Sequence, residues 1–154
     1  MKIEPLTRAG FAPFGDVIEF DGAQRYPINQ GFAERFNDLA RVDVETVNVS
    51  LVIANPRPRP IAITLMERHP LGSQIFYPLQ ERPWLVLVCG DPKDRNSFRA
   101  FSVTGRQGIN YTRNTWHHPL LVLDANSRFL VVDRKGPAAN LEEVQIDEIR
   151  LDQP

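Results

Sequence analysis

The sequence has few of the residues that define several protein classes. It contains one cysteine among 154 residues, so no intrachain disulfide can form. No apolar run approaches the ~18 residues that a membrane-spanning helix needs, and the N-terminus has no apolar signal region. The 18 basic and 19 acidic residues give a net charge of -1, too little to attract nucleic acid or anionic lipid. We expect a soluble, cytoplasmic protein that binds neither nucleic acid nor a membrane.

The single cysteine, Cys89, ends the apolar run that begins at Trp84. We therefore expect a buried thiol rather than a nucleophile. The chain length suits one domain that buries roughly two-thirds of its unfolded surface. The proline-rich segment 55–60 is too short to link two domains, so we expect a single domain over residues 1–154.

Thirteen prolines and nine glycines separate short runs of β-branched and aromatic residues. This pattern is typical of an all-β sandwich or barrel, and we predict an antiparallel double-sheet β-barrel. The predicted strands cover residues 42–54, 61–69, 74–79, 84–89, 98–103, 116–123, 129–134 and 144–151.

Helical signals are limited to two short segments. Thr7 can cap a turn that runs through Phe11. Segment 31–40 is the second candidate, because four of its side chains share one face at helical spacing: Phe32, Arg35, Phe36 and Leu39.

All three histidines lie in two segments, 67–70 and 114–119, and His69 and His118 each stand directly before a proline. Proline biases the preceding residue towards extended backbone, as at the end of a strand. Imidazole suits both metal ligation and proton transfer near neutral pH. This concentration predicts one polar site, although histidines that only cap or pack would give the same pattern.

Strand alternation places Glu67 and His69 on one face, following Ile61, Ile63 and Leu65. A carboxylate and an imidazole at the end of a core-facing row cost several kcal/mol if they are buried without partners. We therefore expect a metal, a water-filled cavity or mutual pairing at the rim of the barrel.

His117 and His118 are adjacent, so only one of them can face the same cavity as His69. The other is expected to pack or to bond locally. The strand from Trp116 to Val122 is apolar on both faces. Because both faces must be covered, this strand predicts a homodimer.

Several blocks of sequence resemble one family when they are taken in order. They are residues 11–18, 28–31, 34–36, 38–40, 67–72, 108–111, 116–119 and 129–134. Together they resemble the cupin superfamily and, within it, the ureidoglycolate lyase family. The resemblance implies a cupin-like jelly roll and a homodimer. It also implies a lyase that cleaves the carbon–nitrogen bond of (S)-ureidoglycolate, giving glyoxylate and urea in allantoin (purine) degradation.

The cupin metal pattern is incomplete in this chain. Glu67 stands at the place of the first histidine, His69 at the second, Gln74 near the glutamate, and His117 at the last histidine. The usual Pro-x-Gly turn is replaced by residues 112–114. The resemblance implies a divalent metal, nickel or similar, held by Glu67, His69 and His117, and no organic cofactor.

Cleavage of ureidoglycolate needs an acid and a base but no redox cofactor. The candidate catalytic residues are His69, His117 and His118 for proton transfer, with Glu67 orienting an imidazole or holding the metal.

Further residues are candidates for binding the substrate. Its carboxylate matches the planar fork of arginine, and the candidates are Arg35, Arg68, Arg82 and Arg113, of which alternation turns Arg68 away. The ureido group could bind Asn29 or Asn110, while Tyr77 and Trp116 could line the pocket. Gln74, which could also assist the metal ligands, is a further candidate for substrate binding. Solvated arginines, turn-forming asparagines and core aromatics are the alternative roles.

Two other functions remain open at this point. A cupin isomerase acting on a sugar or hydroxy acid could use the same cavity, and a non-catalytic sensor could bind a small molecule there. The segment 29–40 favours the lyase, because it resembles that family and not cupins at large.

Overall fold

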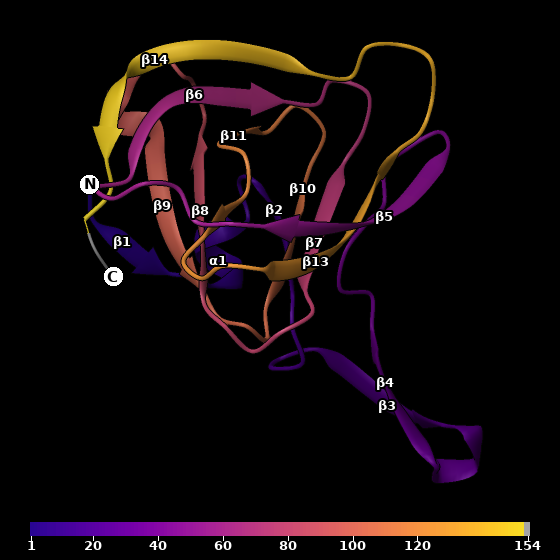
Figure 1. Ribbon diagram of the computed structural model, residues 1–154. Helices are drawn as coiled ribbons and strands as arrows, with labels where there is room; N and C mark the ends of the chain where they lie inside the picture. The colour runs from indigo at the N-terminus through magenta and orange to yellow at the C-terminus, as the bar shows by residue number, and fades with distance from the viewer. Residues whose placement is uncertain (153–154) are drawn as a thin grey trace.

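The computed structural model describes residues 1–152 and consists mainly of two β-sheets (Figure 1). The larger sheet has the order β1-β9-β8-β11-β6-β14, with β12 also paired to β8. Its strands are β1 (Ile3–Pro5), β6 (Ala62–Arg68), β8 (Trp84–Cys89), β9 (Phe98–Val103), β11 (Trp116–His117), β12 (Leu121–Val122) and β14 (Glu142–Arg150).

The second sheet has the order β2-β10-β7-β13-β5. Its strands are β2 (Gly15–Ile18), β5 (Val47–Ala54), β7 (Gln74–Pro78), β10 (Gly108–Tyr111) and β13 (Ser127–Arg134). All pairings in both sheets are antiparallel except β1 with β9. The predicted all-β architecture of two largely antiparallel sheets is confirmed.

The main core lies between the two sheets, where aromatic residues from both layers meet. Trp84 of β8 contacts Phe129 of β13 edge to face, with ring centroids 5.0 Å apart. Alternate residues of β8 face this core, whereas Leu85, Leu87 and Cys89 join a second buried cluster on the other side of the larger sheet. Strand β8 is therefore buried on both faces, as its continuous apolar run predicts.

The first predicted helix is confirmed as α1 (Arg8–Phe11). The Thr7 side chain accepts a hydrogen bond from the backbone N–H of Gly10, the usual N-cap arrangement. Phe11 is fully buried, so α1 closes one part of the main core.

The second predicted helix, 31–40, is wrong. Residues Ala33–Asn37 form β4, which pairs with β3 (Gln24–Ile28). The two strands are joined by the short turn η1 (Asn29–Gly31), where all three residues have positive φ values, 51°, 58° and 90°. These left-handed conformations reverse the chain. Phe32 is left 90% exposed at the tip, so the predicted apolar helical face does not form.

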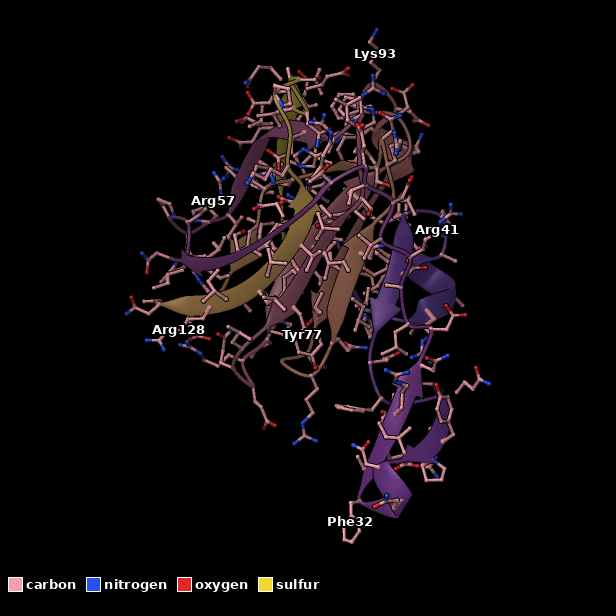
Figure 2. The ribbon with its side chains drawn as sticks, turned by 90° about the vertical axis from the view of Figure 1, so that its right-hand side faces the viewer. Phe32, Arg41, Arg57, Tyr77, Lys93 and Arg128 are labelled. Atoms are coloured by element: carbon pink, nitrogen blue, oxygen red, sulfur yellow. The ribbon has the colours of Figure 1, made fainter. Side chains whose placement is uncertain are left out.

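The β3–β4 hairpin, which we call the arm, projects away from the two sheets (Figures 1 and 2). Near its base, Phe36 contacts Phe20 edge to face, with centroids 4.7 Å apart. Phe32, labelled in Figure 2, lies at the opposite end. The tip of the arm therefore lies well away from the two sheets (Figure 2).

Three strand predictions needed correction. Segment 42–54 forms a strand only over β5, Val47–Ala54, because Asp43 bonds the side chains of Ser73 and Arg113 and not a neighbouring strand. Segment 116–123 divides into β11 and β12, because Pro119 has no N–H to donate to the sheet. Along β6, the alternation is interrupted: Ile63 and Met66 pack in the same cluster. Opposite them, the register of β14 shifts between Gln145 and Ile149, so Ile61 and Ile63 do not share a face with Glu67.

Among residues 1–152, no helix is long and apolar enough to cross a membrane.

Candidate active site

Glu67 and His117 form a directly opposed pair on neighbouring antiparallel strands, β6 and β11. Such pairs place their side chains on the same face of a sheet. Glu67 Oε1 lies 3.3 Å from His117 Nε2. His117 is almost completely buried, and the Glu67 side chain is 16% exposed.

His69 follows the end of β6 and turns back towards the same carboxylate. Its Nε2 lies 3.8 Å from Glu67 Oε1, and its ring centroid lies 5.2 Å from that of His117. The backbone N–H of Asn114 donates to the His69 carbonyl, so the β10–β11 loop fixes this position. The structure thus brings together Glu67, His69 and His117, which we call the trio.

Both imidazoles of the trio are oriented by backbone carbonyls. His69 Nδ1 donates to the Asn140 carbonyl at 2.7 Å, and His117 Nδ1 donates to the Thr115 carbonyl at 2.9 Å. A carbonyl only accepts, so the proton of each neutral ring is on Nδ1. Each Nε2 therefore presents a lone pair, and neither has a hydrogen-bond partner within the described part of the chain.

The arrangement of these acceptor atoms suits a cation. One potential ligand atom from each member of the trio lies within 4.8 Å of the other two. A carboxylate oxygen and two imidazole lone pairs at this separation need a shared proton or metal ion between them. Imidazole Nδ1 bonded to a carbonyl is also the usual outer-shell arrangement of metal-binding histidines. The donor set fits a divalent transition metal.

The surroundings of the trio favour an ionised Glu67. Burial, the largest single influence, acts to raise the pKa of Glu67, but the nearby imidazoles of His117, His69 and His118 together outweigh burial and lower it. The ring of Tyr111 stacks on His117 with centroids 4.0 Å apart. Burial raises the pKa of the Tyr111 hydroxyl, and the negative charge of Glu67 raises it further. We expect Tyr111 to stay neutral beside the trio.

His118 is not a member of the trio. Its Nδ1 donates to the neighbouring Pro119 carbonyl at 2.7 Å, and its backbone N–H donates to the Leu87 carbonyl. Burial lowers the pKa of His118 to about 4. His118 is thus the packing histidine of the adjacent pair, and His117 the inward one.

Of the seven residues expected to bind substrate, two lie near the trio. Gln74 begins β7 directly opposite Tyr111 of β10, so the two side chains share a face. Arg113 lies on the loop that holds His69, where its guanidinium bonds both carboxylate oxygens of Asp43 at 3.1 and 3.0 Å.

The other five lie elsewhere, and each has a structural role or an exposed position. Asn29 and Arg35 belong to the arm. Tyr77 alternates with the core residue Phe76 and lies on the outer face of its sheet (Figure 2). Asn110 donates to Asp16 and to the Arg41 carbonyl, both at 2.9 Å. Trp116 packs against the second buried cluster.

The two remaining arginine candidates are also engaged away from the trio. Arg68 pairs with Glu142 at 2.6 Å and covers the Trp116 ring. Arg82 donates to the carbonyls of Ala125 and Asn126.

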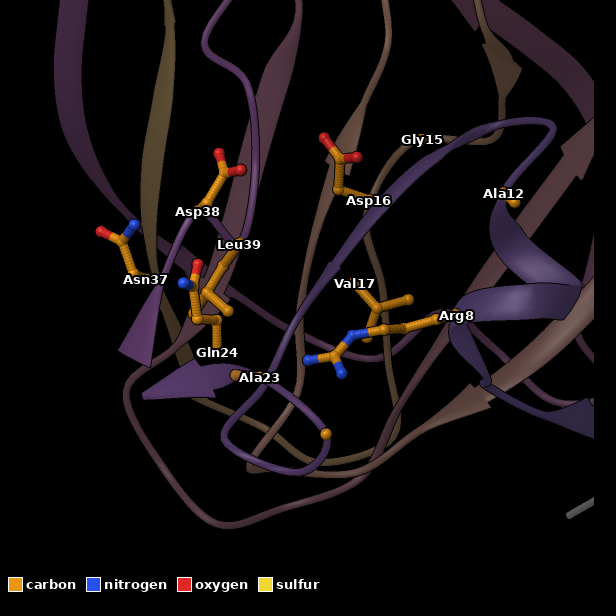
Figure 3. A pocket seen from close by; sticks show the side chains of 11 residues that line it. Arg8, Ala12, Gly15, Asp16, Val17, Ala23, Gln24, Asn37, Asp38 and Leu39 are labelled. Carbon is orange, nitrogen blue, oxygen red and sulfur yellow. The ribbon is translucent and has the colours of Figure 1, made fainter. Parts of the chain in front are cut away.

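A cavity of about 420 Å³ lies between α1, β2 and the base of the arm, and none of the trio lines it (Figure 3). Arg8 projects into it, but its guanidinium already donates to the carbonyls of Asp21 and Glu19. Asp16 accepts hydrogen bonds from Asn110 and from the backbone of Arg41. These groups serve the fold, so the trio is the better candidate site.

Two residues that support the site were not found from the sequence. Asn140 holds His69 through its carbonyl, and its side-chain Oδ1 accepts the Leu71 N–H at 2.7 Å. Tyr111 supports His117 by stacking. Asn140 lies in a loop far along the chain and carries no local signal. Tyr111 was part of the resembling block 108–111, but nothing in its spacing indicated a partner.

Comparison with known proteins now identifies the family. A family model described as ureidoglycolate lyase matches residues 1–152. The chain belongs to the ureidoglycolate lyase family. Ureidoglycolate lyase 1 of Rhizobium meliloti (strain 1021) is 54% identical over 153 residues, which cover 96% of this chain and 90% of that protein.

Ureidoglycolate lyase of Burkholderia mallei (strain NCTC 10229) is 51% identical over 154 residues, covering 96% and 90%. Among solved structures, an oxalate decarboxylase has a TM-score of 0.45 at 17% identity, covering 65% of this chain and 24% of that one. The ureidoglycolate lyase assignment rests on the sequence relatives, not on this distant likeness.

Proposed function

We propose that this protein cleaves (S)-ureidoglycolate to glyoxylate and urea. Membership of the ureidoglycolate lyase family supports the substrate. The observation that carries the chemistry is the position of Glu67 Oε1 between the Nε2 atoms of His117 and His69. Neither comparison supports a sugar isomerase or a sensor.

The reaction requires only that a proton be moved within the substrate. A base takes the hydroxyl proton, the O–H electron pair forms the carbonyl of glyoxylate, and the C–N bond breaks. The electron pair of that bond goes to the ureido nitrogen, which takes up a proton and leaves as urea. No water is consumed and nothing is oxidised. Positioned acid and base groups contribute roughly 10²- to 10⁴-fold each to such a step.

The trio would hold a divalent metal ion through Glu67, His69 Nε2 and His117 Nε2, with nickel or a similar ion as the expected species. When bound, such an ion supplies Lewis-acid polarisation of a substrate oxygen. Asn140 and Thr115 hold the two rings so that both Nε2 atoms face Glu67.

Which residue of the trio transfers the proton depends on which of their lone pairs bind the metal. A free Nε2 on His69 or His117 can accept the hydroxyl proton and return it to the departing nitrogen. Where both Nε2 atoms and one oxygen of Glu67 hold the metal, the second carboxylate oxygen of Glu67 is the remaining acceptor in the trio. We further propose that Arg113, on the loop that holds His69, binds the substrate carboxylate in exchange for Asp43, which its guanidinium bonds in this structure.

We further propose a homodimer, on different grounds from those given by the sequence. The faces around Leu121 and Val122 are already covered within the chain, because the two residues are buried in different clusters. The uncovered surface is instead the outer row of β5, where large apolar residues are 52–72% exposed: Val47, Val49, Leu51 and Ile53. A row of this kind marks an interaction surface. A cytoplasmic location remains a prediction.

The proposed activity is tested by incubating the purified protein with racemic ureidoglycolate and measuring glyoxylate and urea against a protein-free blank. We expect equal amounts of both products and consumption of half the substrate. Chelation followed by return of Ni²⁺ tests the metal separately. Failure to release glyoxylate above the blank, with or without Ni²⁺, would overturn the proposal.

A further inference from the structure

A row of three polar side chains crosses the inner face of the five-stranded sheet at the end where the trio lies. Asn48 of β5 is paired with Asp133 of β13. Asp133 follows Val132, which pairs with Ile75 of β7, so Asp133 lies next to Gln74. All three alternate with outward-facing residues and point to the side of the main core.

Hydrogen bonds link the row. Asn48 Nδ2 donates to Asp133 Oδ1 at 2.9 Å, and Gln74 Nε2 donates to Asp133 Oδ2 at 3.5 Å. An ionised carboxylate only accepts, so it turns the NH₂ group of each amide towards itself. The Gln74 carbonyl oxygen is thereby forced to point away from Asp133.

That oxygen, Gln74 Oε1, is buried and has no hydrogen-bond partner among residues 1–152. A buried acceptor without a donor is unfavourable by itself. The position of Gln74 places this oxygen on the side of the trio. Gln74 is directly opposite Tyr111, whose ring stacks on His117 of the trio. Gln74 also begins the strand that follows the His69 turn.

We propose that Gln74 Oε1 accepts an N–H of the terminal NH₂ of the substrate's ureido group, and that Asp133, held by Asn48, is the positioning residue that fixes this orientation. The inference rests on the proposed function. The ureido group carries three N–H bonds, whereas the aldehyde and carboxylate groups of glyoxylate present only acceptors. An oriented carbonyl acceptor beside the trio therefore selects the nitrogen end of the substrate.

This assignment predicts discrimination against an analogue that lacks the terminal NH₂. In 2-acetamido-2-hydroxyacetate, a methyl group replaces that NH₂, while the C–N bond that breaks and the glyoxylate released are the same. A site built to bond an N–H rejects an analogue that lacks it, because the acceptor stays unpaired. For the native protein, we expect kcat/KM to be at least roughly tenfold higher with ureidoglycolate than with the analogue.

Two variants test the roles separately. Gln74→Leu removes the acceptor, and Asp133→Asn offers an NH₂ that can bond Gln74 Oε1 and turn the amide round. Both are expected to abolish most of the discrimination, chiefly by raising KM for ureidoglycolate, with little change for the analogue. Gln145→Leu makes the same change of side chain at an exposed position of β14 and should retain the native ratio.

The outcomes distinguish this inference from the proposed function. Native protein that releases no glyoxylate from either compound overturns the proposed function itself. Native protein that is active but accepts both compounds equally overturns the role of Gln74, and this result needs no variant to fold. Retained discrimination in folded Gln74→Leu also overturns it. Loss in Gln74→Leu but not in folded Asp133→Asn overturns the positioning role of Asp133.

Discussion

Glu67 Oε1 lies 3.3 Å from Nε2 of His117, its directly opposed partner on the neighbouring strand. The Nδ1–H of His117 is already bonded to a carbonyl, so two acceptor atoms face each other in a buried setting. Such a contact is stable only with a cation or proton between the two atoms. We therefore take Glu67 and His117 as the centre of the candidate active site.

Removing the negative charge of Glu67 should weaken metal binding by the trio without altering the shape of the site. For Glu67→Gln we expect at least a tenfold loss of Ni²⁺ affinity by isothermal titration calorimetry, because a neutral amide is a poorer ligand than a carboxylate. The lyase activity should fall at least as far. Glu148→Gln is the matched control, since Glu148 is exposed on β14 and bonds Arg150 instead of a member of the trio. Equal Ni²⁺ affinity in both variants would remove Glu67 from the metal site.

The exposed row of β5 should determine the assembly state. We expect Leu51→Asp to convert a dimer of about 35 kDa into a monomer of 17.5 kDa in sedimentation experiments, because a charge at the centre of an apolar contact is unfavourable. Leu51 is 72% exposed, so folding of the chain itself should be little affected. Leu141→Asp, at an exposed loop position, should stay dimeric. A native protein that sediments as a monomer at micromolar concentration contradicts the dimer.

Cys89 should be inert in the folded protein. Burial raises the pKa of the Cys89 thiol to about 12, and the negative charge of Asp91 makes a smaller contribution in the same direction. The reactive thiolate is therefore scarce at pH 8, and its fraction should increase only when the pH approaches this value. We expect no rapid reaction with a thiol reagent at pH 8 in buffer, and one equivalent after unfolding in guanidinium chloride. Fast stoichiometric labelling of the native protein would show that the thiol is accessible.

Much of the fold was predictable because its strongest signals are local. Residues 84–89 and 98–103 form strands with the predicted bounds, since continuous or alternating apolar runs between turns leave few other choices. Segment 31–40 failed because a ten-residue helical pattern is weak by itself. The left-handed residues from Asn29 to Gly31 reverse the chain there, and sequence periodicity does not report backbone conformation at a turn.

The candidate site was predictable in its centre but not in its surroundings. Alternation and the His-Pro pairs identified Glu67 and His69, and left His117 and His118 as alternatives that only the register of β11 resolves. Asn48 and Asp133 lie far apart along the chain and meet through sheet pairing. Asn140 reaches His69 through the packing of a distant loop. Tyr77, Asn110 and Trp116 are close in sequence to residues of the site, but their side chains do not point towards the main core between the two sheets.

The most direct test of the account is the rate of glyoxylate and urea release from (S)-ureidoglycolate by His69→Ala, with His118→Ala assayed beside it. His69→Ala removes a lone pair that faces Glu67 and should abolish release. Its fold should survive, with a stability loss of about 1–2 kcal/mol from the lost bond to Asn140. His118→Ala removes a packing residue outside the trio and should retain activity at a temperature where circular dichroism shows it folded. Activity of His69→Ala within a factor of two of the native protein, with loss of activity in folded His118→Ala, would contradict the assignment of the trio.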